Sequence, residues 1–227
     1  MARHEVLSQS SCFLVKHPLT PTLLPPVVVA SQHVCAPFHY PNYYGHLDWI
    51  SHVRPEHVRC TAEVRNADGS VASVVPLSGP LHHPERDVTL LSLSDPGDAE
   101  ALGLPVLELG ELGVGGGFVQ GREVTCEGHA VQEEAKGEGE ETSRNSIPEA
   151  VRCFMALASP KQTFIYPTAP LVDGMCGGPV IEEEGGRVLG ILEGIVPDSH
   201  HQEQMRGLGS IVGADEIKSI LSQTTIR

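Results

Sequence analysis

Glycine and proline interrupt this chain so often that long helices have little room to form. The 227 residues include 24 Gly and 18 Pro, and both residue types favour turns and weaken helix interiors. Short apolar runs fill the intervals between these turn formers. They fall at residues 27–30, 60–64, 71–75, 88–93, 104–109, 123–126, 163–166, 179–181, 188–192 and 209–212. This spacing predicts an all-β protein built as a barrel or a sandwich.

Few segments depart from the strand pattern. A helix is predicted at 215–221, where Ala214-Asp215-Glu216 supplies an N-terminal signal, and a second helical pattern covers 147–157. The stretch 133–145 is polar, contains glycine and is net acidic. We interpret it as a disordered surface loop, because it has too few apolar groups to offset the entropy of ordering it.

The charge distribution narrows the choice of partners. The chain has 15 basic and 29 acidic residues. Residues 1–94 hold 6 basic and 7 acidic residues, whereas residues 95–227 hold 9 basic and 22 acidic residues and are therefore strongly negative. A polyanion would be repelled by that second part, so nucleic acid is excluded as a partner. No apolar run reaches the ~18 residues of a membrane span, and no basic amphipathic segment fits a lipid surface.

The N-terminus and the cysteines predict a location. The opening residues, MARHEVLSQSSCFLV, contain no apolar core of secretory length, so no signal peptide is expected. The six cysteines are scattered without CxxC spacing, and we expect reduced thiols in an intracellular, cytoplasmic protein. Pairs of cysteine and histidine lack the compact spacing of a structural zinc site, so no metal or other cofactor is expected.

The segment Gly174-Met175-Cys176-Gly177-Gly178-Pro179-Val180 has the composition of a nucleophile turn. A nucleophile that attacks a carbonyl must stand clear of the backbone, while nearby N–H groups point at the oxyanion that forms. Glycines on both sides permit the unusual turn and leave space for a substrate backbone. A glycine-rich turn with a small buried cysteine is the alternative interpretation.

A thiol nucleophile needs a base, and one of the twelve histidines is a candidate for this role because of its place in the sequence. His33 ends the apolar run VVVASQH, so a rigid strand can present its ring. Asp87 leads directly into the run VTLLSL, where it could orient an imidazole. Each residue alone has an ordinary explanation, as a surface histidine or a turn aspartate. The combination is more specific.

Together these segments resemble the trypsin-like, chymotrypsin-fold peptidases. VVVASQHVC is similar to the family's histidine strand, RDVTLLSL to its aspartate strand, and GMCGGPV to its G-x-S-G-G-P motif with Cys in place of Ser. Residues 12–15 resemble the strand before the histidine, and the resemblance covers residues 10–223. It implies two six-stranded antiparallel β-barrels with a C-terminal helix. The domains would be 1–100, carrying His33 and Asp87, and 101–227, carrying Cys176.

The resemblance also implies roles for the site residues. His33 would be general base and acid, Asp87 would hold its tautomer, and Cys176 would attack, with the imidazole lowering the pKa of the thiol. The N–H groups of Gly174 and Cys176 would form the oxyanion hole. The backbone of Glu193, Gly194 and Ile195 would pair with an extended polypeptide substrate, although Glu193 is equally well explained as a solvated charge.

Three departures from the family pattern bear on function. Cysteine replaces the nucleophilic serine, as in related viral cysteine proteases. Met175 stands where secreted members carry an aspartate that pairs with a newly freed N-terminus, so activation by that route is not expected. Residues 168–172 offer no aspartate to attract Lys or Arg, so trypsin-like basic specificity is not supported. The alternative function is that of an inactive protease-like domain that binds proteins or peptides. A third possible function is an acyl-transfer activity other than peptide hydrolysis.

Overall fold

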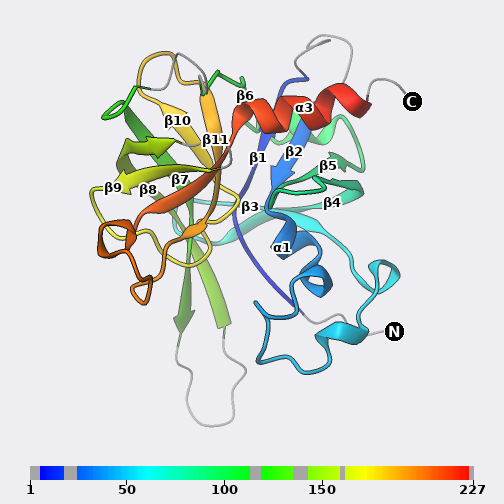
Figure 1. The fold of residues 1–227 in the computed structure, drawn as a ribbon. Coiled ribbons are helices and arrows are strands. Elements are labelled where there is room, and N and C mark those ends of the chain that lie inside the picture. Colours follow the sequence, from blue (N-terminus) through cyan, green and yellow to red (C-terminus); the bar gives the residue numbers. More distant parts are fainter. Residues whose placement is uncertain (1–5, 18–24, 113–118, 135–142, 159–161, 225–227) are drawn as a thin grey trace.

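The computed structural model describes residues 6–17, 25–112, 119–134, 143–158 and 162–224 (Figure 1). Its strands form two six-stranded sheets, which confirms the all-β prediction and the chymotrypsin-like fold. The first sheet contains β1 (Cys12–Val15), β2 (Val27–Ala30), β3 (Thr61–Arg65), β4 (Val71–His82), β5 (Thr89–Leu93) and β6 (Val106–Leu107). The second contains β7 (Glu123–Glu134), β8 (Ser143–Ala158), β9 (Thr163–Pro167), β10 (Pro179–Glu182), β11 (Val188–Ile195) and β12 (Gly209–Gly213).

Short helices lie in the connections, and one longer helix ends the described chain. The α-helices are α1 (Gln32–Cys35), α2 (Asp98–Ala101) and α3 (Ala214–Thr224). In the described ranges, four 3₁₀ turns complete the elements, at Pro37–His39, Ile50–His52, Pro55–His57 and Glu203–Met205. The helix α3 confirms the prediction for 215–221. Among the described residues, no helix is long and apolar enough to cross a membrane.

The second sheet is a closed barrel, in the order β10-β11-β12-β9-β8-β7. Strand β10 closes it by pairing with β7, with Val180 opposite Cys126. Inward side chains such as Val124, Cys153 and Ile165 are fully buried and form one apolar cluster. Fully burying a side chain of this size contributes about 1.5–3 kcal/mol, so the barrel is a rigid base for the segments that it carries.

The first sheet corrects the prediction of a second closed, fully antiparallel barrel. Its order is β3-β4-β5-β2-β1-β6, and it stays open between β3 and β6. Strand β6 pairs in parallel with β1, Leu14 opposite Val106, and is only two residues long. Because β6 does not pair with β3, this sheet is not a closed barrel. Because β6 lies beyond residue 100 and still joins the first sheet, the sheets do not divide the chain there; the two domains stay a prediction.

Two segments near the barrel differ from their predictions. Residues 147–157, predicted as a helix, belong to β8, which pairs with β7 and with β9. The buried positions Val151, Cys153 and Met155 recur at every second residue, which is the period of a strand. The predicted loop 133–145 is too long at both ends, because β7 runs to Glu134 and β8 begins at Ser143. Residues 135–142 lie outside the described residues.

A shared apolar core holds the two sheets together under α3. Ile217, Ile220 and Leu221 of the helix are buried in one cluster with side chains of both sheets. Val29 comes from the first sheet and Ile191 from the second. In Figure 1, α3 crosses the top of the molecule beside β11 and β2. This core fixes the histidine-bearing sheet relative to the barrel.

Candidate active site

Two neighbouring strands bring His33 and Asp87 together. Strand β2 ends at Ala30, three residues before His33, and pairs with β5, with Ala30 opposite Thr89. Asp87 stands two residues before Thr89. Its carboxylate accepts two hydrogen bonds from the histidine: Oδ1 is 2.7 Å from the His33 backbone N, and Oδ2 is 2.5 Å from Nδ1. His33 is buried, at 6% exposure. These bonds fix both the position and the orientation of the imidazole.

Tyrosines that follow His33 in the sequence complete its surroundings. Tyr44 donates a hydrogen bond from its hydroxyl to the His33 carbonyl oxygen, at 2.9 Å. The Tyr43 ring lies 4.9 Å from the imidazole between centroids, and the Tyr40 ring lies edge-on at 6.2 Å. The sequence analysis missed these residues. Three tyrosines clustered at positions 40–44, shortly after a candidate histidine, were the signal that could have found them.

The turn that contains Cys176, residues 174–178, packs closely against residues next to the first sheet. Gly177 has φ of +84°, and a Cβ there would lie 2.2 Å from the Ser11 carbonyl oxygen and 3.2 Å from the Ser31 nitrogen. Only glycine fits such a contact. Ser31 stands two residues before His33, so the contact brings the residue next to Cys176 against the start of the histidine segment. The Cys176 thiol is also close enough to Asp87 for the negative charge of that carboxylate to raise the thiol pKa.

Ser11, which the sequence analysis also missed, holds this turn in place by hydrogen bonds. Its backbone N–H donates to the carbonyl oxygens of Gly174 and Cys176, at 2.8 and 3.0 Å, and its hydroxyl donates to the Gly174 oxygen at 2.7 Å. The same hydroxyl accepts the backbone N–H of His129 at 2.8 Å. Ser11 is 4% exposed, so it links the turn to β1 and β7 without competition from water. No sequence motif marks it, because the contact spans 163 residues.

Hydrogen bonds to the preceding carbonyl groups orient the N–H groups of Gly174 and Cys176. The Asp173 oxygen accepts the N–H of Val131 at 2.9 Å, and the Met175 oxygen accepts that of Gly178 at 2.9 Å. In a trans peptide the N–H points opposite to the carbonyl, so these bonds orient the following N–H groups. Among the described residues, neither N–H has a backbone acceptor, although the Cys176 N–H bonds its own thiol and so partly offsets the rise in the thiol pKa. Both remain able to donate to an oxyanion.

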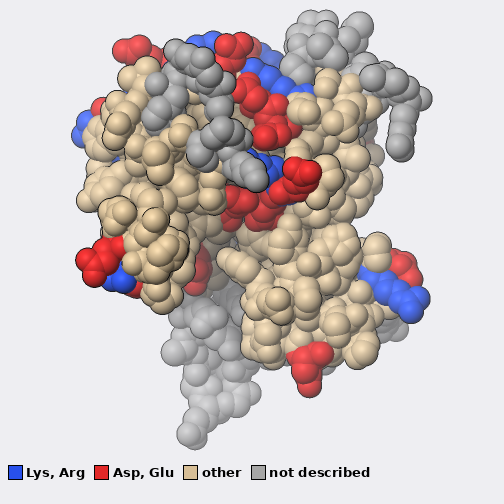
Figure 2. All heavy atoms as spheres, viewed as in Figure 1, with Lys and Arg blue, Asp and Glu red and all other residues tan. Residues whose placement is uncertain are grey.

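The electrostatic setting of Cys176 differs from the expectation of an activated thiolate. Burial, together with the negative charges of Asp87, Asp173 and Glu193, raises the pKa of the Cys176 thiol from 9.0 to about 11. A buried thiolate surrounded by carboxylates is disfavoured. The thiol is therefore protonated at neutral pH in the resting site. Figure 2 shows acidic side chains, with basic ones among them, in the hollow between the two halves of the molecule.

A groove of about 430 Å³ runs beside this site. It is lined by His33 and Asp87, by the tyrosines Tyr40 and Tyr43, and by residues 193–197 of β11 and the loop after it. The three residues predicted to pair with substrate, Glu193, Gly194 and Ile195, all lie in it. On their barrel side, β11 pairs with β12, whereas β10 pairs only with residues 188–191. In the described part of the chain, the outer edge of 193–195 is not covered by a strand.

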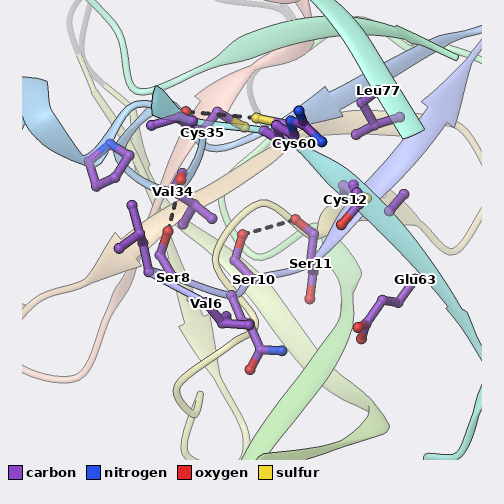
Figure 3. Close-up of a pocket in the computed structure, with 18 of the residues that line it drawn as sticks. Val6, Ser8, Ser10, Ser11, Cys12, Val34, Cys35, Cys60, Glu63 and Leu77 are labelled. Carbon is purple, nitrogen blue, oxygen red and sulfur yellow. Dashed lines mark hydrogen bonds between the residues drawn. The ribbon is translucent and has the colours of Figure 1, made fainter. Parts of the chain in front are cut away.

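A second cavity, of about 490 Å³, contains none of the predicted catalytic residues (Figure 3). Cys35 and Cys60 meet at its wall, where the Cys60 Sγ lies 3.8 Å from the Cys35 carbonyl oxygen. A hydrogen bond with Cys35 lowers the pKa of Cys60 to about 7. All six cysteines are free thiols, as predicted. Within the described ranges, no three His, Cys, Asp or Glu side chains are arranged to hold a metal ion.

The fold and this arrangement define a chymotrypsin-like protein, and comparison with known proteins gives its family. The model of the trypsin-like peptidase domain matches residues 10–191. The chain belongs to this family, and its substrate class is polypeptide. No curated protein matches.

Two solved structures of a mycobacterial protein are similar to the chain. The inactive form of the Rv3671c protease is 16% identical, with a TM-score of 0.51 over 95% of this chain and 89% of that one. A serine-to-alanine mutant of Rv3671c from M. tuberculosis H37Rv, also inactive, is 15% identical, with a TM-score of 0.49 over 96% and 83%. At this identity the likeness shows the fold alone.

Proposed function

We propose that the chain is an endopeptidase in which Cys176 is the nucleophile, His33 the general base and acid, and Asp87 the group that orients the histidine. The observation that carries the proposal is the double hydrogen bond from the His33 backbone and ring to Asp87, at 2.7 and 2.5 Å. With Nδ1–H donating to the carboxylate, Nε2 is left unprotonated and able to accept a proton. The substrate is a polypeptide in an extended conformation.

The raised pKa of Cys176 sets the order of the first step. Because the thiol is protonated at rest, Sγ attacks the carbonyl carbon while its proton moves to His33 Nε2. The electron pair of the C=O bond moves to the oxygen, which accepts hydrogen bonds from the N–H groups of Gly174 and Cys176. When the C–N bond breaks, the leaving amine takes the proton from Nε2, and a thioester to Cys176 remains.

Hydrolysis of the thioester uses the same groups. A water molecule gives a proton to Nε2 as its oxygen attacks the thioester carbonyl, and the C–S bond then breaks. The departing sulfur takes the proton back from His33, which restores the resting thiol and releases a carboxylic acid. The substrate backbone is held as an added strand by the uncovered edge of Glu193, Gly194 and Ile195.

Substitution of the nucleophile tests the proposal. We expect Cys176→Ala to abolish cleavage of a quenched-fluorescence peptide library and Cys176→Ser to retain a small part of it. Cys60→Ala, which removes a thiol in the other cavity, is the matched control and should keep wild-type activity. Equal cleavage by the wild type and Cys176→Ala would refute the proposal.

The alternative, an inactive binding module, is favoured by one observation: the acidic surroundings that raise the pKa of Cys176. It predicts that the wild type cleaves no peptide in the library while Cys176→Ala and the wild type bind the same peptides with equal affinity.

A further inference from the structure

We propose that the groove beside His33 contains a subsite for a cationic side chain of the substrate, with the Glu193 carboxylate as its anionic group. This inference rests on the proposed peptidase function and adds a substrate class to it: polypeptides with Lys or Arg in the bound stretch. The subsite is separate from residues 168–172, which contain no acidic residue. The position of Glu193, the hydrogen bonds of its carboxylate and the charges around that carboxylate support the proposed subsite.

Hydrogen bonds hold the Glu193 carboxylate at the groove. Oε2 accepts a hydrogen bond from the Ser210 hydroxyl at 2.7 Å, and Ser210 in turn accepts one from the Gln162 amide nitrogen at 3.0 Å. Ser210 is 7% exposed and lies on β12, directly beside β11. The side chain of Glu193 is therefore fixed by a buried partner, unlike that of an ordinary solvated glutamate. All three residues line the groove.

The charge of Glu193 is not neutralised by a protein cation. In the part of the chain that the structure describes, Glu193 forms no ion pair, and none of the residues that line the groove is Lys or Arg. Asp87 lines the same groove and already accepts both hydrogen bonds from His33. One Glu193 oxygen remains without a described protein partner, so a substrate ammonium or guanidinium group can bind it.

Aromatic faces complete a site for a cation. Tyr40 and Tyr43 line the groove together with Glu193, and Tyr43 is 64% exposed. A ring face attracts a cation, and desolvation beside a carboxylate strengthens the attraction. Burial and the charges of Asp87 and Glu193 raise the pKa of Tyr40 to about 12, so its hydroxyl stays neutral. The groove thus offers a carboxylate and uncharged aromatic surface, the combination that suits Lys or Arg.

A bound cation would also affect the nucleophile. Glu193 is one of three carboxylates whose negative charge raises the pKa of the Cys176 thiol. A cation that pairs with Glu193 offsets that charge and lowers the free energy of forming the thiolate. Recognition at this subsite would therefore raise kcat as well as lower KM, so peptides that lack the cation would be poorer in both parameters.

The test compares arginine with citrulline, which has nearly the same shape without the charge. Matched quenched-fluorescence peptides place one of the two residues at each position around the scissile bond. At the position bound by the subsite we expect the wild type to prefer arginine about tenfold or more in kcat/KM, equivalent to about 1.4 kcal/mol. Glu193→Gln should reduce this preference to within about twofold.

Controls separate the subsite from folding and from catalysis. Ser210→Ala keeps the negative charge of Glu193 but removes the hydrogen bond that positions its carboxylate. This variant should therefore reduce the preference for arginine only in part. If Glu193→Gln unfolds, salt titration of the wild type decides, because screening must weaken a charge-based preference. Fluorescence anisotropy of the same peptides with Cys176→Ala measures binding even if the chain proves unable to cleave. An equal response to arginine and citrulline in binding and cleavage, or an arginine preference that Glu193→Gln keeps, would overturn the inference.

Discussion

Replacing Asp87 by asparagine tests the geometry of the candidate site most directly. The Asp87 carboxylate accepts hydrogen bonds from both the backbone N–H and the ring Nδ1 of His33, at 2.7 and 2.5 Å. An asparagine side chain has one oxygen and one NH₂ group, so it can keep only one of these two bonds in its present form. If the oxygen accepts the backbone N–H, the NH₂ group faces Nδ1 and donates to it. That arrangement selects the tautomer with the proton on Nε2.

In the proposed mechanism, this tautomer removes the base, because a protonated Nε2 cannot accept the proton of the Cys176 thiol. Since the pKa of the thiol is raised to about 11, little thiolate exists at neutral pH to react without a base. General-base assistance contributes about 10²- to 10⁴-fold, and we expect Asp87→Asn to lower kcat/KM by a factor in this range. Losing one charge-assisted hydrogen bond should also lower the free energy of unfolding by about 1.5–3 kcal/mol.

The pH dependence distinguishes loss of the base from a general loss of structure. In Asp87→Asn the remaining activity should follow the thiolate population, which rises about tenfold per pH unit below the thiol pKa. The wild type, with its base intact, should rise far less between neutral pH and about pH 9. The assay is steady-state cleavage of a library-selected peptide, with the melting temperature measured at each pH. A loss below tenfold in a folded variant, or a pH profile parallel to that of the wild type, would refute the proposed role of Asp87.

Three further predictions concern the thiols and the nucleophile turn. At neutral pH iodoacetamide should modify Cys60, whose pKa is about 7, before Cys176, whose pKa is about 11; peptide mass mapping that finds Cys176 modified first would contradict these directions. Gly177→Ala should lower kcat/KM by about 10²-fold or more, because its Cβ would lie 2.2 Å from a backbone oxygen, whereas Gly186→Ala, at φ of +64° with no atom within 4 Å, should reduce stability only. Ser11→Ala removes the hydroxyl bonds at 2.7 and 2.8 Å and should lower kcat more than it raises KM; a kinetically unchanged variant would show that the turn does not depend on this hydroxyl.

The strands and the order of the candidate residues could be predicted because their signals are local. The run 27–30 forms β2, and His33 follows it as expected. The wrong prediction of a helix at 147–157 has a local cause as well, because Val151, Cys153 and Met155 alternate with the period of a strand and not of a helix. The open first sheet was harder to predict, because its outer strand β6 pairs with β1, which is far from it in the sequence.

The chemistry of the candidate site could not be read from the sequence in the same way. Ser11 lies 163 residues from Gly174, yet it fixes the carbonyls of the nucleophile turn. The pKa of Cys176 depends on carboxylates at positions 87, 173 and 193, which come together only when the two sheets pack. A cysteine and a histidine in family order suggest an ion pair, whereas burial and three negative charges favour the neutral thiol. In the proposed mechanism, proton transfer to His33 therefore accompanies attack, so the hydrogen bonds to Asp87 and the charge at Glu193 both act on the same step.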